Sequence, residues 1–148
     1  MKKVLFFDDE PSITNYLVMN LRDNYGWKGE KEITFVSTVE ALLNEINKND
    51  VTFDLFVLDV MAPMPSEELK KQFSKDELDK MDSGRCLGFV MAEKIRRIDK
   101  YKSVPVLYLS ARINSSIPDL EREYTFYLRK PVSAKEITQK MKELLKLH

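Results

Sequence analysis

The chain has 148 residues, 43% of them hydrophobic and 32% charged, which suits one globular domain. Its 24 basic and 24 acidic residues give a formal net charge of zero, so composition does not support a general nucleic-acid or membrane-surface binder. The single cysteine, Cys86, excludes an intramolecular disulfide and indicates a reducing, cytoplasmic setting. His148 is the only histidine, which excludes a histidine-based triad or a multi-histidine zinc site. No apolar run approaches the roughly 18 residues that span a bilayer, so we expect no membrane insertion.

Five short apolar runs predict strands that are buried on both faces. In chain order they are Val4–Phe7, Ile33–Val36, Phe53–Leu58, Val104–Leu109 and Thr125–Leu128. Apolar residues at helical spacing predict the segments between and after them. These helices begin at Ser12, cover Val39–Ile46 and Leu87–Ile98, continue weakly over Ile113–Tyr124 where Pro118 interrupts, and end with Ile137–Leu145.

Three Ser-x-x-Glu sequences are capping boxes that predict helix starts. They are Ser37–Glu40, Ser74–Glu77 and Ser133–Glu136. Strands that alternate with amphipathic helices imply a parallel sheet covered on both faces and joined by right-handed crossovers. We therefore expect a flavodoxin-like, doubly wound α/β fold with strand order 2-1-3-4-5, in which ligands bind outside the carboxyl ends of the strands.

The segment 64–87 does not follow this repeat. It is charged, has little core periodicity, and carries the Ser74 capping box and the apolar residues Leu69, Phe73, Leu78 and Met81. We interpret it as one or two short surface helices inserted after the third strand. The insertion is either a tolerated surface excursion or a functional element beside the strand-three exit, since a longer loop adds little closure entropy.

Polar residues terminate the predicted strands. Asp8 and Asp9 follow the first strand, Asp59 the third, Ser110 the fourth and Lys130 the fifth. In a 2-1-3-4-5 sheet these ends converge, and three carboxylates there suit a hard cation such as Mg²⁺. A lysine and a serine beside them can hold a phosphoryl group, and an aspartate can be the nucleophile that accepts it.

Each of these residues also has a simpler interpretation. Adjacent acids after a strand are commonly a solvated turn, Ser110 alone is typical of a helix cap, Lys130 of a surface charge and Tyr127 of the core. These simpler interpretations do not predict that the polar residues all end successive strands at one sheet edge.

The sequences FFDDEPS, FVLDVMAP, PVLYLSAR and FYLRKPV, in this order, resemble the receiver domain of two-component response regulators, including the stand-alone CheY-like receivers. The resemblance covers nearly the whole chain apart from the insertion. It implies that Asp59 is the phosphoacceptor, and that Asp8, Asp9, Asp59 and the Met61 carbonyl bind Mg²⁺. It further implies that Ser110 and Tyr127 are switch residues, that Lys130 senses the phosphate, and that the Lys130–Pro131 bond is cis.

Two departures from the family affect the output surface. A glycine follows the family's proline after a few residues, whereas here Gly88 lies 25 positions beyond Pro63, with Gly84 as a rival for that role. Pro118 shortens the predicted fourth helix of the repeat. We expect residues 1–148 to form a single receiver domain with its insertion at about 64–87.

The expected function is a phosphorylation-dependent signalling switch, not an enzyme with an external substrate. A histidine kinase or histidine phosphotransfer protein would donate the phosphoryl group, and output would pass to an effector protein or along a phosphorelay. With the fifth helix ending the chain, we expect no attached output domain and no nucleic-acid partner.

Two alternatives belong to other classes. A receiver-like binding module would act without phosphorylation, but the complete set of polar residues favours the switch. A Mg²⁺-dependent aspartyl phosphohydrolase of the haloacid-dehalogenase type would need an acid two residues after the nucleophile, where this chain has Met61.

Overall fold

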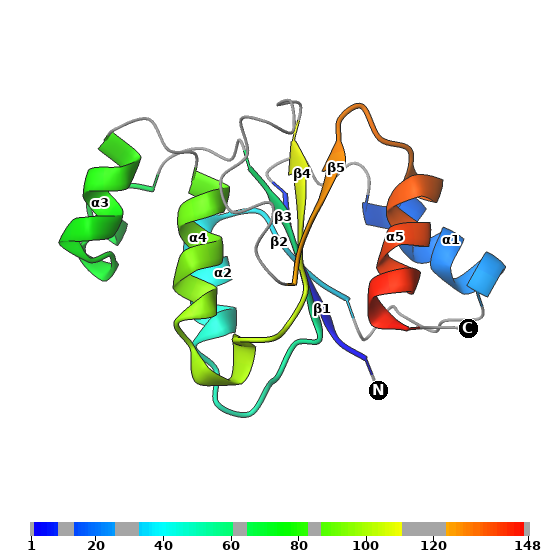
Figure 1. Cartoon of the computed structure of the whole chain (residues 1–148), viewed down its shortest axis with the longest axis horizontal. Helices are drawn as coiled ribbons and strands as arrows, with labels where there is room; N and C mark the ends of the chain where they lie inside the picture. Colours follow the sequence, from blue (N-terminus) through cyan, green and yellow to red (C-terminus); the bar gives the residue numbers. More distant parts are fainter. Residues whose placement is uncertain are drawn as a thin grey trace.

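The computed structural model describes residues 2–8, 14–25, 33–60, 65–82, 87–110 and 124–146. Five strands form one parallel sheet in the order β2-β1-β3-β4-β5 (Figure 1). The strands are β1 (Val4–Phe7), β2 (Ile33–Val36), β3 (Leu55–Asp59), β4 (Val106–Ser110) and β5 (Thr125–Arg129). The predicted doubly wound fold and its strand order are therefore confirmed.

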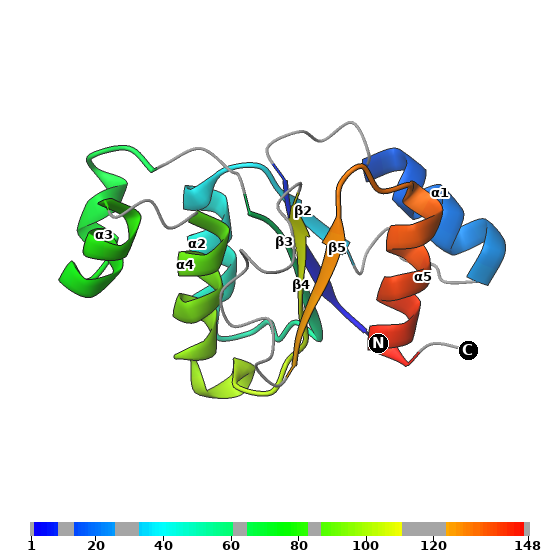
Figure 2. The same ribbon diagram turned by 45° about the horizontal axis from the view of Figure 1, so that its top comes forward.

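Helices cover both faces of the sheet. On one side lie α1 (Thr14–Tyr25) and α5 (Ala134–Leu145), and on the other lie α2 (Val39–Ile46) and α4 (Leu87–Arg96), as Figures 1 and 2 both show. A short 3₁₀ helix, η3 (Asp99–Tyr101), leads from α4 toward β4. The helix start predicted at Ser12 lies outside the described residues, as does the weak helix predicted over Ile113–Tyr124 except for its last residue.

The sheet separates two hydrophobic clusters. Every residue of β1, β3 and β4 is buried, as expected for central parallel strands without a solvent face. Side chains that alternate along each strand face opposite helix layers, so Leu5 and Phe7 join the α2–α4 side while Val4 and Phe6 join the α1–α5 side. Asp8, Asp59 and Ser110 thus lie at the ends of strands that are buried on both faces.

Some predicted boundaries were wrong by one or two residues. The N-cap of α2 is Thr38, whose hydroxyl accepts the Ala41 N–H at 3.1 Å, so the capping box predicted at Ser37 does not form. The helix predicted to reach Ile98 ends at Arg96. The capping box at Ser133 is confirmed, with its hydroxyl accepting the Glu136 N–H at 3.1 Å.

The insertion contains η2 (Leu69–Gln72) and α3 (Lys75–Asp82), which confirms the prediction of one or two short helices. The Ser74 capping box also forms, because the Ser74 hydroxyl accepts the Glu77 N–H at 3.1 Å and Glu77 Oε1 accepts the Ser74 N–H at 2.7 Å. In Figures 1 and 2, α4 lies between α3 and the sheet. The insertion therefore adds a partial third layer on one side of the molecule.

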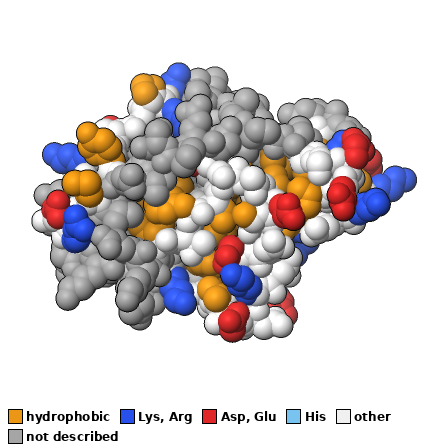
Figure 3. Space-filling view, turned by 180° about the vertical axis from the view of Figure 1, so that it is seen from behind, with side chains coloured by type: hydrophobic (Ala, Val, Ile, Leu, Met, Phe, Trp, Pro, Cys, Tyr) orange, Lys and Arg blue, Asp and Glu red, His pale blue; other side chains and the backbone are white. Residues whose placement is uncertain are grey.

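Charge is evenly mixed on the face of the molecule opposite to that of Figure 1. Acidic and basic side chains of the described residues are interspersed there (Figure 3), in keeping with the zero net charge of the sequence. None of the helices among the described residues combines the length and the apolar character that a membrane crossing requires.

Gly88 is where α4 touches the backbone of β3. Its N–H donates to the Val60 carbonyl oxygen at 3.2 Å. A Cβ atom at this position would lie 2.6 Å from Val60 Cα and 2.8 Å from the Asp59 carbonyl oxygen, and backbone atoms cannot rotate away. Gly88 thus packs closely enough against the backbone to serve as the glycine expected at the start of the helix after the insertion. Gly84, the other candidate for that role, lies outside the described residues.

We predict that Gly88→Ala destabilises the protein by about 1–3 kcal/mol, the usual cost of overpacking a well-packed interior. The midpoint of urea unfolding measures the change. Lys135→Ala, an exposed substitution in α5, serves as the control and leaves the midpoint nearly unchanged. A Gly88→Ala protein as stable as wild type would mean that α4 can withdraw from β3 freely.

Candidate functional site

Four of the predicted polar residues, Asp8, Asp59, Ser110 and Lys130, lie at the carboxyl edge of the sheet. Asp59 is the last residue of β3 and is only 4% exposed, and Ser110 is the last residue of β4 and is fully buried. Asp8 directly follows β1, and Lys130 directly follows β5. Because all five strands are parallel, these four residues share one edge, as the sequence predicted.

Lys130 brings two carboxylates together. Its ammonium nitrogen lies 3.5 Å from Asp59 Oδ1 and 4.0 Å from Asp8 Oδ2. The Asp8 and Asp59 side chains are 10% and 5% exposed, so both carboxylates are largely removed from water, whereas the lysine is 36% exposed. A positive charge at this position offsets the mutual repulsion of the acids.

The ends of β4 and β5 are linked through a single carbonyl group. The Ser110 carbonyl oxygen accepts the Lys130 N–H at 2.8 Å and the Tyr127 hydroxyl at 3.2 Å. Tyr127 is half-buried and packs against the hydrophobic cluster on the α2–α4 side. The Lys130–Pro131 peptide bond is cis, as expected. A displacement of the β4 end would therefore reach both Tyr127 and Lys130.

Two residues of the predicted constellation cannot be placed. Asp9 and Met61, which the sequence resemblance implies as metal ligands, lie outside the described residues. Within the ranges that the structure describes, no three side chains of histidine, cysteine, aspartate or glutamate are grouped closely enough to hold a metal ion. The geometry of a complete metal site is therefore not defined by the described residues alone.

The donors that are described nevertheless fit Mg²⁺. Asp8 and Asp59 supply carboxylate oxygens, the ligands that this hard cation prefers, and they approach the same ammonium group. Asp59 is buried and Asp8 nearly so, whereas Lys130 beside them is partly exposed. Asp8 is held in place through its backbone N–H, which donates to the Val36 carbonyl oxygen of β2 at 3.1 Å.

Comparison with known proteins defines the fold class further. The receiver domain of a Francisella response regulator is 24% identical, with a TM-score of 0.65 and coverage of 99% of this chain and 98% of that one. The Vibrio cholerae chemotaxis protein CheY4 is 21% identical, with a TM-score of 0.62 and coverage of 97% and 98%. The chain thus has the fold of the CheY-like receiver domains of response regulators.

A curated relative is also a response regulator. The DNA-binding dual master transcriptional regulator RpaA of Synechocystis sp. is 25% identical over 148 residues, which cover 99% of this chain. The chain spans 50% of the length of that relative. No protein-family model matches the chain. The family whose motifs the sequence resembles is the family to which these structural and curated relatives belong.

We predict that Lys130→Ala lowers the free energy of unfolding by about 1–2 kcal/mol in the absence of divalent metal. Removing the Lys130 ammonium leaves two largely inaccessible carboxylates without this partner, which destabilises the folded state. Because Lys130 is partly exposed, the loss is smaller than for a fully buried ion pair. Urea unfolding in EDTA measures it. Lys102→Ala, which removes an exposed ion pair with Asp99, is the matched control and has little effect. Equal stability of Lys130→Ala and wild type would show that Lys130 does not offset the repulsion.

Proposed function

We propose that this protein is a phosphorylation-dependent signalling switch that accepts a phosphoryl group on Asp59. The observation that carries the proposal is the buried Asp59 carboxylate at the end of β3, with Lys130 Nζ 3.5 Å away and Asp8 beside the same ammonium. A carboxylate that is nearly inaccessible, yet paired with a partly exposed cation, is arranged to receive an anionic group rather than to interact with bulk water.

The transfer itself uses Asp59 as the nucleophile. One carboxylate oxygen attacks the phosphorus of a phosphohistidine on a kinase or phosphotransfer protein, the O–P bond forms and the P–N bond breaks. The electron pair of the broken bond returns to the imidazole, which takes up a proton as it leaves. Lys130 lies where it can pair with the transferred oxygens, and the Ser110 hydroxyl can donate to them.

The acids Asp8, Asp9 and Asp59, with the Met61 carbonyl, would hold Mg²⁺. Bound there, the cation would supply charge neutralisation for the phosphoryl oxygens. The role of Asp8 is then to bind and orient, and that of Asp59 is to bind and attack. Neither role requires a histidine in this chain, which is consistent with the single histidine at position 148.

Signalling follows from the new negative charge. An acyl phosphate adds a charge of about −1.5 to −2 if it resembles a phosphate ester. Attraction of the Ser110 hydroxyl and Lys130 toward this charge would shift the ends of β4 and β5, and Tyr127 would follow because its hydroxyl is bonded to the Ser110 carbonyl. An effector protein would sense this edge of the molecule, and residues 1–148 would act as one receiver domain.

We predict that Asp59→Asn abolishes phosphoryl uptake while the fold survives, because the amide is nearly isosteric and is not a nucleophile. Intact mass after incubation with acetyl phosphate and Mg²⁺ provides the measurement. Asp50→Asn, at an exposed acid in the segment that precedes β3, is the control and gains phosphate like wild type. Phosphate on the Asp59→Asn protein would place the nucleophile elsewhere, and an unmodified wild type would favour the binding module that acts without phosphorylation.

We also predict that Lys130→Ala still accepts phosphate in part but no longer transmits it to Tyr127. Beryllofluoride, a phosphoryl mimic, should shift the backbone amide signals around Tyr127 in wild type and much less in the variant. Wild-type shifts in Lys130→Ala would show that Lys130 does not relay the signal.

A further inference from the structure

The insertion is bound to the core rather than lying loosely on the surface. Phe73 and Met81 are each 6% exposed and belong to the same hydrophobic cluster as Val60 and Leu87, which flank the insertion. As a result α4 is buried on nearly every side, between the sheet and α3 (Figure 2). A surface excursion that only closes a loop would not need to contribute side chains to this cluster.

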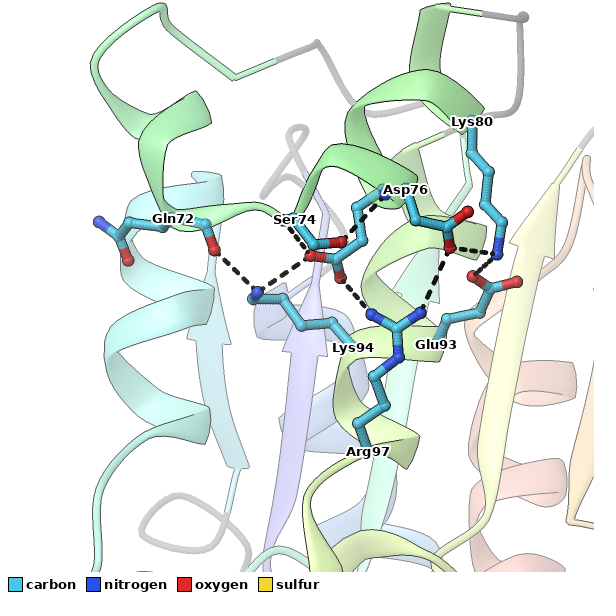
Figure 4. A network of polar contacts seen from close by, with 8 residues as sticks. Gln72, Ser74, Asp76, Lys80, Glu93, Lys94 and Arg97 are labelled. Atoms are coloured by element: carbon cyan, nitrogen blue, oxygen red, sulfur yellow. Dashed lines mark hydrogen bonds and ion pairs between the residues drawn. The ribbon is translucent and has the colours of Figure 1, made fainter.

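Polar contacts join α3 to the C-terminal part of α4 (Figure 4). Glu77 of α3 takes part in them through both of its carboxylate oxygens. It is 1% exposed, and among the described residues only Glu77 and Asp59 are buried acids. Glu77 Oε1 lies 3.4 Å from Lys94 Nζ, and Glu77 Oε2 lies 3.3 Å from Arg97 Nη1. Because the same carboxylate closes the Ser74 capping box, it both starts α3 and joins it to Lys94 of α4 and to Arg97, the residue that follows α4.

Further contacts surround this carboxylate. Lys94 Nζ donates to the Gln72 carbonyl oxygen at 2.9 Å and lies 5.0 Å from the centre of the Phe73 ring. Lys80 Nζ lies 2.8 Å from Glu93 Oε2 and 3.3 Å from Asp76 Oδ2. Basic side chains from both helices thus alternate with acidic ones across the interface between α3 and α4.

The Lys80 ammonium stays charged at neutral pH. The hydrogen bonds and charges of Glu93 and Asp76 raise the pKa of Lys80 above its usual value of 10.5. A raised lysine pKa means that its favourable contribution is present below 10.5 and is lost only as pH rises beyond that value. Salt concentration, which screens the exposed pairs, is therefore the appropriate variable for loosening the interface.

Helix α4, which packs against the insertion, also contacts the candidate phosphoacceptor Asp59. Gly88, at the start of α4, donates its N–H to the Val60 carbonyl and leaves no room for a Cβ against Asp59 and Val60. β3 ends at Asp59, and α4 begins at Leu87. Contacts at Glu77 and contacts at Gly88 therefore act on the same ten-residue helix, Leu87–Arg96.

We infer that the described part of the insertion, residues 65–82, is a positioning element that holds α4 against the end of β3. Glu77 is the positioning residue that joins α3 to α4. This inference rests on the proposed role of Asp59 for its effect on phosphorylation. Loss of the Glu77 contacts loosens Gly88 from Val60. The Asp59 carboxylate is then misplaced relative to Asp8 and Lys130.

Amide hydrogen exchange tests the positioning directly, without any phosphate. In Glu77→Ala, exchange at the Gly88 amide should rise about two- to thirtyfold, the range expected when a coupled contact is removed. Asp79→Ala, an exposed acid on the same helix, is the matched control and leaves it unchanged. If α3 amides exchange faster in Glu77→Ala while Gly88 stays as in wild type, the inference is overturned.

A conservative variant and a double variant guard against simple loss of structure. Glu77→Gln keeps an oxygen for the Ser74 cap but loses the charge, so it should fall between wild type and Glu77→Ala. If Glu77 acts through Arg97, the Gly88 amide of the Glu77→Ala/Arg97→Ala protein exchanges about as fast as in the faster of the two single variants. Independent effects would instead multiply the two increases in exchange rate. Multiplying effects would overturn the assignment of this contact.

The phosphorylation readout separates this inference from the proposed function. Uptake from acetyl phosphate should be slower in Glu77→Ala by a similar factor and partly restored in Glu77→Gln. If wild type takes up no phosphate, the proposed function fails, whereas the exchange result at Gly88 still decides the positioning role. If uptake is normal in Glu77→Ala although Gly88 is loosened, the insertion does not position Asp59 and the inference is overturned.

Discussion

The charge balance between Lys130 and the carboxylates of Asp8 and Asp59 is the interaction on which the site depends. Two acids at adjacent strand ends repel each other, and burial makes the repulsion stronger. Unit charges 4 Å apart near a protein surface interact by about 4 kcal/mol before desolvation is counted. One ammonium within 3.5 Å and 4.0 Å of the two carboxylates therefore makes the arrangement tolerable.

Hydrogen bonds to backbone carbonyl groups connect Lys130 to the rest of the fold. The Ser110 carbonyl accepts both the Lys130 N–H and the Tyr127 hydroxyl, which ties the cation to the ends of two strands. At the opposite end of the sheet, Arg96 of α4 donates to the carbonyl oxygens of Val104 and Tyr124, the latter at 2.7 Å. Helix α4 thus contacts β3 at its start, the approach to β4 and β5 at its end, and the insertion along its outer side.

The fold could be predicted because its determinants are local and repeated. Central strands are continuous apolar runs, and in a parallel sheet their polar ends converge, so the sequence alone predicts that Asp59, Ser110 and Lys130 lie close together. The α2 cap was missed because Ser37 and Thr38 are adjacent hydroxyls. Only the backbone conformation decides which of them caps the helix, and here it is Thr38, in an extended conformation.

The role of the insertion was harder to predict for a different reason. Its apolar residues follow neither a strand nor a long helix period, so the burial of Phe73 and Met81 depends on a surface supplied by α4. Glu77 was identified as part of a capping box, but its pairing with Lys94 and Arg97 joins residues 17 and 20 positions away in the chain (94 − 77 and 97 − 77). Local patterns contain no information about such contacts.

Trapping the modified residue chemically tests the central claim most directly. Borohydride reduces an aspartyl phosphate to homoserine, so wild-type protein treated with acetyl phosphate and Mg²⁺, then reduced and digested, records the acceptor in its peptide masses. The account predicts homoserine at position 59, dependent on prior phosphorylation, and unmodified aspartate at positions 8 and 9. Homoserine at either of those positions, or an unmodified Asp59 in protein that has gained phosphate, would contradict it.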